Sequence, residues 1–112
     1  MIGLTAVALT IAQPQLARRG DCGWVHGRYD VTNGSRIHRI WMIGSDHILS
    51  IDTPDEGAGN ATGAMARLYG RFALLDEDVF GDFYVCAEEP RISGHMQWVR
   101  LKRVKNVRFV RR

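Results

Sequence analysis

Apolar and polar side chains alternate along much of this chain with the period of two that an extended β-strand requires. From Trp24 to Val31, the residues Val25, Tyr29 and Val31 share one face, and Trp24, His26, Arg28 and Asp30 share the other. Gly27 lies on the apolar face, where a missing side chain indicates a bulge or the close approach of another strand. Further strands are expected at 36–43, 47–51, 79–87 and 96–110, with Lys105-Asn106 as the place where the last could break. The chain is therefore expected to be mainly β.

Two short segments add to this pattern. Asn33-Gly34 follows the first strand and predicts a tight hairpin, since both residues tolerate positive φ. Asn60 can cap a short helix whose apolar positions recur at helical spacing up to Phe72, although Gly63 weakens it. In the strand at 36–43 both faces carry apolar and basic residues, so the pattern leaves open which face is buried.

The resulting order is strand, strand, strand, helix, strand, strand. It resembles the order of the OB-fold, a five-stranded Greek-key barrel with a helix between its third and fourth strands. We therefore expect a five-stranded OB-like barrel, with a small β-sandwich or a β-roll as the alternative. A chain of 112 residues has room for one such domain, which we assign to residues 22–112.

The two cysteines are far apart and form no C-x-x-C motif, which excludes a thioredoxin-like centre and a common zinc site. In an OB-like barrel the first and fourth strands pair, so Cys22 and Cys86 would lie side by side. The sequence thus predicts a Cys22–Cys86 disulfide, as in proteins of oxidising compartments. The alternative is two free thiols in a cytoplasmic protein.

Residues 1–12 form an uncharged apolar run that ends in Thr10-Ile11-Ala12, small residues that suit signal peptidase. The positive start of a usual signal peptide is missing, so a short N-terminal helix is the alternative. We expect residues 1–21 to be a short or truncated signal segment with a flexible lead-in at 13–21. The protein would then be periplasmic or secreted.

Several segments resemble those of small exported bacterial proteins of unassigned function. They are Cys22-Gly23-Trp24-Val25-His26-Gly27-Arg28, Arg39-Ile40-Trp41-Met42-Ile43-Gly44, Gly81-Asp82-Phe83-Tyr84-Val85-Cys86 and the stretch from Pro90 through Gly94-His95-Met96-Gln97. This resemblance implies export and the cysteine pair, and it brings no catalytic motif.

Catalytic signals are weak. Ser45-Asp46-His47 holds the residue types of a triad, but successive strand side chains point apart. The chain has four histidines, His26, His38, His47 and His95. If His26 and His38 faced each other across the first hairpin they could hold a metal with His47 or Asp30, but no spacing enforces such a site. We therefore expect no cofactor and no enzyme activity, and keep a small metal-dependent enzyme as an alternative.

Binding is the stronger hypothesis, because OB-like barrels bind ligands on the second and third strands and the flanking loops. Seven of the last thirteen residues are basic and no acid follows Glu89, which favours acidic partners. Alternation puts Trp98, Arg100 and Lys102 on one face, whereas Arg103 and Lys105 need a bulge to join it. The candidate ligand-binding residues are Arg36, His38, Arg39, Trp41, Arg91, His95, Trp98, Arg100 and Lys102.

We thus expect a non-enzymatic extracytoplasmic binding or structural module. Its partner would be a polyanion, a glycan or an envelope protein. The alternative is an intracellular OB-type nucleic-acid-binding protein, which would require free thiols.

Overall fold

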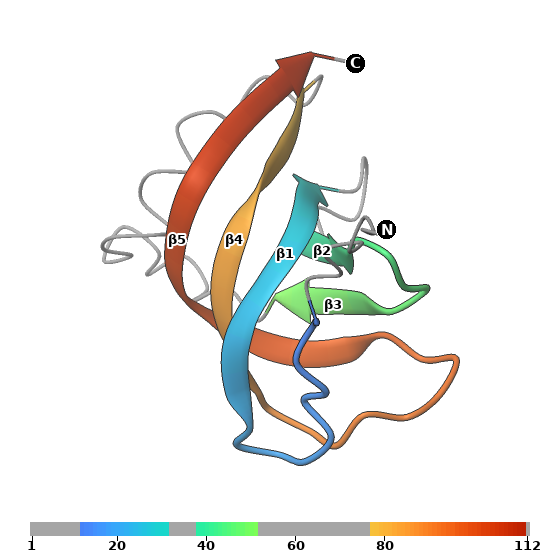
Figure 1. Ribbon diagram of the computed structural model, residues 1–112. Helices are drawn as coiled ribbons and strands as arrows, with labels where there is room; N and C mark the ends of the chain where they lie inside the picture. Colours follow the sequence, from blue (N-terminus) through green and yellow to red (C-terminus); the bar gives the residue numbers. More distant parts are fainter. Residues whose placement is uncertain (1–11, 32–37, 52–76, 112) are drawn as a thin grey trace, which may run out of the picture.

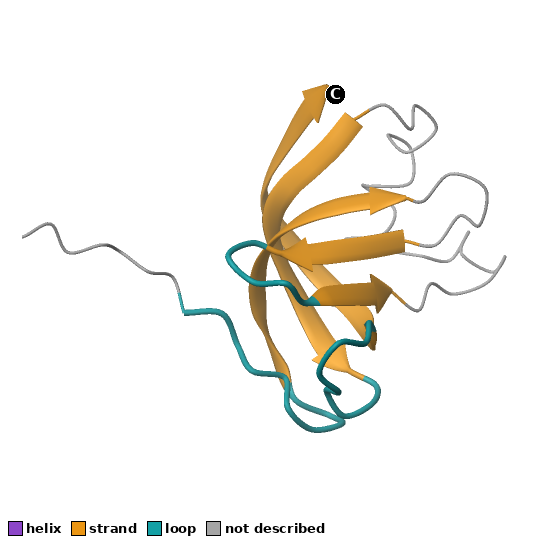
Figure 2. Ribbon diagram, turned by 90° about the vertical axis from the view of Figure 1, so that its right-hand side faces the viewer, coloured by secondary structure: helices purple, strands orange, loops and turns teal. Residues whose placement is uncertain are grey.

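The computed structural model describes residues 12–31, 38–51 and 77–111. These residues form five strands, and no helix occurs among them (Figure 2). The strands are β1 (Cys22–Val31), β2 (His38–Met42), β3 (Ile48–Ile51), β4 (Glu77–Ala87) and β5 (Gln97–Arg111). No segment in these ranges is therefore a helix able to cross a membrane. The expected helix after Asn60, the Asn33-Gly34 hairpin turn and the candidate residue Arg36 lie outside the described residues.

The five strands form one closed barrel in the order β1-β2-β3-β5-β4 (Figure 1). All neighbours are antiparallel except β3 and β5, which run parallel from Leu49 beside Gln97 to Ile51 beside Val99. The ring closes because β1 pairs with β2 on one side and with β4 on the other. The predicted five-stranded barrel is confirmed. The alternative of a small β-sandwich does not fit, because the sheet closes on itself.

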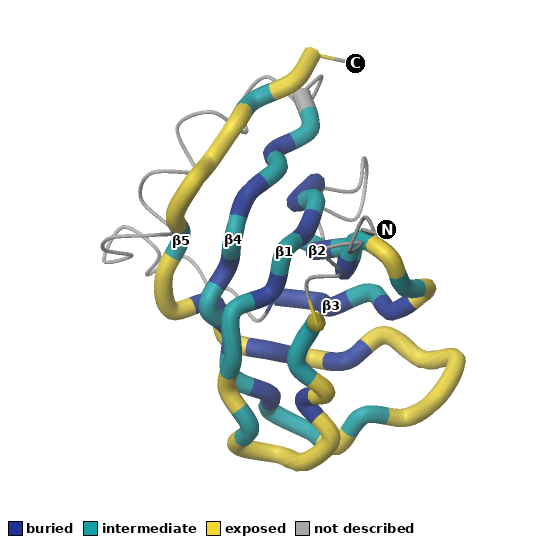
Figure 3. Tube along the Cα trace, in the orientation of Figure 1, coloured by how far each residue is buried: buried dark blue, intermediate teal, exposed yellow. Residues whose placement is uncertain are grey.

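All five strands contribute buried residues to the core, and buried residues alternate with less buried ones along β1, β2 and β4 (Figure 3). In β1 these are Val25 and Tyr29, on the face that the sequence predicted. In β2 the buried residues are Ile40 and Met42, which settles the facing that the sequence left open. The remaining core residues come mainly from β3, β4 and β5 and include Leu49, Ile51, Val79, Phe83, Val85, Val99 and Leu101.

Residues 12–21 lie against the barrel, in the part of the chain where the sequence predicted a flexible lead-in. Leu16 is only 2% exposed and belongs to the core cluster. The Gln13 side chain donates to the carbonyl oxygens of His26 and Ile43 and accepts from the backbone N–H of His26. An irregular backbone gives these residues no period, which is why the sequence pattern did not indicate their packing.

Cys22 and Cys86 are directly opposite each other where β1 pairs with β4. Their Cα atoms are 4.0 Å apart and their sulfur atoms are bonded. The predicted disulfide is confirmed, and it ties the start of the first strand to the end of the fourth.

β5 contains two irregularities in its pairing with β4. Lys102 is an extra residue between Leu101, which pairs with Val85, and Arg103, which pairs with Tyr84. Asn106 and Val107 together lie opposite Gly81, and Asn106 has a φ of 55°. Such bulges bend a strand, and β5 curves from its place beside β3 to run along β4 (Figure 1). The strand is therefore distorted at Lys105-Asn106 but continues.

Candidate functional site

The structure distributes the predicted ligand-binding residues over three places. Arg39 and Trp41 lie on β2, on the side opposite the buried Ile40. Arg91 and His95 lie in the connection between β4 and β5. Trp98, Arg100 and Lys102 are exposed residues of β5.

A hollow of about 320 Å³ lies over β1, β2 and β3. The Arg28 guanidinium carbon is 5.2 Å from the centre of the Trp41 ring, a cation–π distance. Asp30 is only 8% exposed and accepts from Arg39 Nε at 3.2 Å. This carboxylate lies on the outer face as predicted, but its arginine neighbours cover it. The hollow is lined by Arg28, Asp30, Arg39, Trp41 and Ile48.

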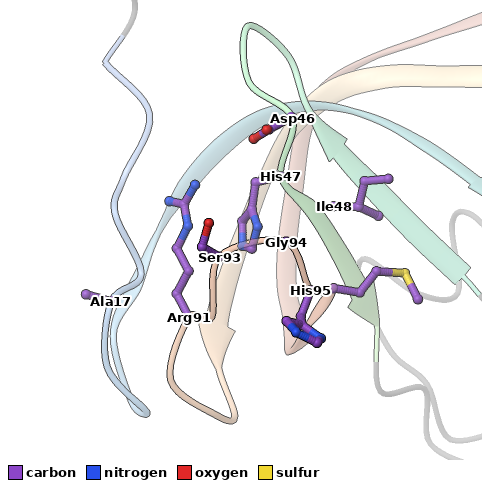
Figure 4. Close-up of a pocket in the computed structure, with 9 residues that line it drawn as sticks. Ala17, Asp46, His47, Ile48, Arg91, Ser93, Gly94 and His95 are labelled. Atoms are coloured by element: carbon purple, nitrogen blue, oxygen red, sulfur yellow. The ribbon is translucent and has the colours of Figure 1, made fainter.

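A second cavity, of about 410 Å³, lies between the start of β3 and the connection from β4 to β5 (Figure 4). It contains the predicted residues Arg91 and His95, together with residues that the sequence did not assign to binding. Ile48 lines both hollows, so the two adjoin. The lining residues are Ala17, Asp46, His47, Ile48, Arg91, Ser93, Gly94, His95 and Met96.

His38 lines neither of these hollows. It shares the inward face of β2 with Ile40, and its Nδ1 is 2.6 Å from the Tyr29 hydroxyl. Burial lowers the pKa of His38, because the charged imidazolium is disfavoured away from water. The residue thus belongs to the inward face of the barrel at the start of β2.

The histidines do not converge. His26 contacts Asp82, and His47 contacts Gln97. Over the described ranges, no group of three or more His, Cys, Asp or Glu side chains is placed to hold a metal ion. Ser45 Oγ donates to the Met42 carbonyl, while the His47 ring bonds elsewhere. The Ser45-Asp46-His47 sequence therefore forms no triad.

A third feature is the outer face of β1, β4 and β5, which we call the cationic face. Its rows are set by the strand pairing, since paired residues point to the same side of a sheet. One row is Trp24, Tyr84 and Arg103, and a second row is Arg28, Phe80 and Arg108. Between them lies the row of His26, Asp82 and Lys105.

Aromatic rings and cations alternate on this cationic face. The Trp24 and Tyr84 ring centres are 5.3 Å apart. Lys105 Nζ lies 4.1 Å from the centre of the Trp24 ring, and the Arg108 guanidinium carbon lies 5.7 Å from that of Phe80. The rings hold the cations at the surface, because a half-buried aromatic face attracts positive charge.

Asp82 is the acid at the centre of the cationic face. It accepts from Asn106 Nδ2 at 2.7 Å and lies 3.0 Å from His26 Nδ1. The Asn106 hydrogen bond is the main cause that lowers the pKa of Asp82, with His26 and Lys105 adding to it and partial burial opposing it. The carboxylate therefore stays ionised and positions Asn106 in the second bulge of β5.

The sequence pattern did not predict that Trp24, Phe80 and Tyr84 lie together on one outer face of the barrel. Alternation predicted that Trp24 faces outward with Arg28, but only the pairing of three strands shows which cations stand beside it. The sequence also gave no signal for Gln97, which is 1% exposed.

Comparison of the chain with protein-family models, with curated proteins and with solved structures found no match. Its class is therefore defined by its own architecture. It is a small, disulfide-linked, five-stranded β-barrel that carries two adjoining hollows and an outer face of alternating cations and aromatic rings.

Proposed function

We propose that this protein is an exported, non-enzymatic, OB-like barrel that binds an acidic polymer, most simply an acidic glycan, on its cationic face. The observation that carries this proposal is the pair of bulges in β5. Strict alternation would turn Arg103 and Lys105 to the side opposite Arg100. The extra residue Lys102 returns them to the side of Arg100, and the second bulge adds Arg108.

The OB-like part of the proposal is supported by the strand order and the pairing directions. The order β1-β2-β3-β5-β4 and the parallel β3–β5 pair are consistent with a five-stranded Greek-key barrel such as the OB-fold. The Cys22–Cys86 disulfide is consistent with an oxidising compartment. It supports export, which the resemblance to small exported bacterial proteins also implies.

The charge of the cationic face supports a polyanion. Arg103 and Arg108 are exposed, and no described carboxylate forms an ion pair with either. A row of such cations attracts a charged polymer by releasing its counterions, so its affinity falls steeply with salt. The rings of Trp24 and Tyr84 offer flat apolar area between the charges. Export favours a glycan over a nucleic acid as the polymer.

The test is to measure binding of the full chain to heparin and to single-stranded DNA at low and moderate salt. The double variant Arg103→Ser/Arg108→Ser should weaken heparin binding at moderate salt about tenfold or more and reduce the salt dependence by roughly two counterions. The matched control Arg18→Ser/Arg19→Ser removes the same charge from exposed residues outside the barrel strands and should bind almost as wild type.

Equal weakening in both variants would show that net charge alone is responsible and would contradict the proposal. Absence of heparin binding in the wild-type chain would contradict it as well. A clear preference for single-stranded DNA would favour the nucleic-acid alternative.

A further inference from the structure

The cavity between the start of β3 and the β4–β5 connection contains a histidine whose protonation pattern is set by its neighbours. Gln97 Nε2 donates to the backbone carbonyls of Leu16 and Glu89, each at 2.9 Å. Only the amide nitrogen can donate to a carbonyl, so the amide oxygen of Gln97 must face His47. That oxygen lies 2.8 Å from His47 Nε2. His47 Nε2 therefore carries a proton.

In the neutral ring this arrangement leaves Nδ1 as a hydrogen-bond acceptor. His47 is only 5% exposed and lines the cavity, and no group of the described chain donates to its Nδ1. Since His47 lines the cavity, a donor to Nδ1 has to come from water or from a ligand in that cavity. The cavity thus contains a hydrogen-bond acceptor, His47 Nδ1, to which a ligand hydroxyl group can donate.

The other polar groups of the cavity include both hydrogen-bond donors and hydrogen-bond acceptors (Figure 4). Asp46 is a second acceptor, and Ser93 can either donate or accept. Arg91 is half-buried and uses one nitrogen, Nη1, to donate to the Gln15 carbonyl at 3.2 Å. Its remaining N–H groups can bind an anionic oxygen. Ile48 and Met96 add apolar surface beside these groups.

This combination discriminates between ligands. Inorganic phosphate can donate from a P–OH group, but its second negative charge would face the Asp46 carboxylate with more like charge than a single carboxylate brings. A neutral sugar would leave the Arg91 guanidinium without an anion. A carboxylate that also carries hydroxyl groups matches both requirements.

We propose that this cavity is a binding site for a small hydroxylated carboxylate, such as a uronic acid unit. The carboxylate contacts Arg91, and a ligand hydroxyl donates to His47 Nδ1. The site does not depend on the cationic face, because none of its lining residues belongs to the outward rows of β1, β4 and β5. The protein is thus proposed to have two separate binding sites, the cationic face for an acidic polymer and this cavity for a small ligand.

The test is an NMR titration of the full chain with D-glucuronate, D-glucose and inorganic phosphate. Glucuronate should shift the His47 ring and the Ser93 and Gly94 amide resonances, and glucose should bind at least tenfold more weakly. Phosphate should bind at least tenfold more weakly than glucuronate, because its second charge is repelled by Asp46. Unshifted cavity resonances with glucuronate, or equal shifts with phosphate or glucose, would overturn the proposal, whatever the outcome with heparin.

Variants sharpen this test. Arg91→Gln should weaken glucuronate binding about tenfold or more, since a charge-assisted hydrogen bond is lost, and Arg91→Lys should recover part of it. The control Arg19→Gln removes one charge from an exposed residue outside both proposed sites and should leave glucuronate binding unchanged. Equal weakening by Arg91→Gln and Arg19→Gln would reduce the effect to general electrostatics and refute the site. The wild-type comparison of the three ligands stands even if Arg91→Gln disturbs the contact with Gln15.

Discussion

Single residues at crowded or buried positions set the geometry of this barrel. Gly27 lies where β1 crosses closest to β2, and a Cβ there would be 2.5 Å from Ile40 Cγ2 and 2.9 Å from the Trp41 carbonyl oxygen. The close approach that the sequence indicated at this glycine is confirmed. Gln97 acts in a different way, because its buried amide joins Leu16, Glu89 and His47 in one hydrogen-bonded group.

His38 makes stability depend on pH at the residue scale. Burial lowers its pKa from the ordinary value of 6.5, so the unfolded chain takes up the proton first as the pH falls. The stability contributed by the neutral ring is therefore complete above about pH 6.5 and is lost progressively below it. We expect urea unfolding between pH 7.5 and 5.5 to show a smaller loss of stability in His38→Gln than in the wild type. Identical losses in the two proteins would contradict this assignment.

At the scale of elements, β5 links two different neighbours along its length. Its first residues, Gln97 to Val99, pair in parallel with β3, and from Val99 to Arg111 it runs antiparallel to β4. The bulge at Lys102 lies just beyond the residues that pair with β3 and bends the strand there. The same bulge turns Arg103 outward, so one irregularity affects both the bend of the strand and the charge of the barrel surface.

The disulfide acts between two elements, β1 and β4, and we expect it to supply a large share of the stability. It joins cysteines 64 residues apart, and the chain-entropy relation gives about 4 kcal/mol for a loop of this length. Cys22→Ser/Cys86→Ser should therefore lower the free energy of unfolding by roughly 2–5 kcal/mol in denaturant titrations. Wild-type protein treated with a reductant should unfold at the denaturant concentration of the variant. An unchanged midpoint in both would show that the bond adds nothing.

At the scale of the whole molecule, the barrel includes residues that precede its first strand. Leu16 packs into the core, and the backbone of this segment is tied to the end of β4 by hydrogen bonds between Gly20 and Ala87 and between Ala87 and Asp21. The Arg91 backbone N–H donates to the Ala17 carbonyl, which anchors the segment to the β4–β5 connection. Through Ala17 the segment also lines the cavity that contains His47 and Arg91.

Leu16→Ala measures how far the folded unit depends on this segment. Removing a buried leucine side chain should cost about 2–5 kcal/mol, from lost transfer energy and the cavity left behind. The matched control is Ile92→Ala, because Ile92 is 59% exposed and its truncation should change stability by no more than about 0.5 kcal/mol. If both variants unfold at the same denaturant concentration, residues 12–21 are not part of the cooperative unit.

The local pattern of the sequence determined the strands, the inward face of β1 and the pairing of the cysteines. The strands and the inward face of β1 follow from period-two alternation, which acts between near neighbours in the chain. The pairing of the cysteines followed from the order of the strands, which resembled a fold whose first and fourth strands are neighbours. The need for a bulge before Arg103 could face outward with Arg100 was also visible in the sequence, because alternation alone put them on opposite sides.

Tertiary structure decided which face of a strand is buried where alternation fitted both faces equally well. It also decided the long-range contacts, which alternation does not predict. Both faces of the strand at 36–43 carried apolar and basic residues, and only packing against β1 and β3 turned Ile40 and Met42 inward. The same holds for the candidate ligand residues, since Arg39 and Trp41 gather with Arg28 while Arg91 and His95 gather with His47. Leu16 and Gln97 are both buried and lie next to each other although they are far apart in the sequence, since the hydrogen bond from Gln97 Nε2 to the Leu16 carbonyl spans 81 residues. Such contacts depend on strand register and barrel closure, and these are properties of distant segments taken together.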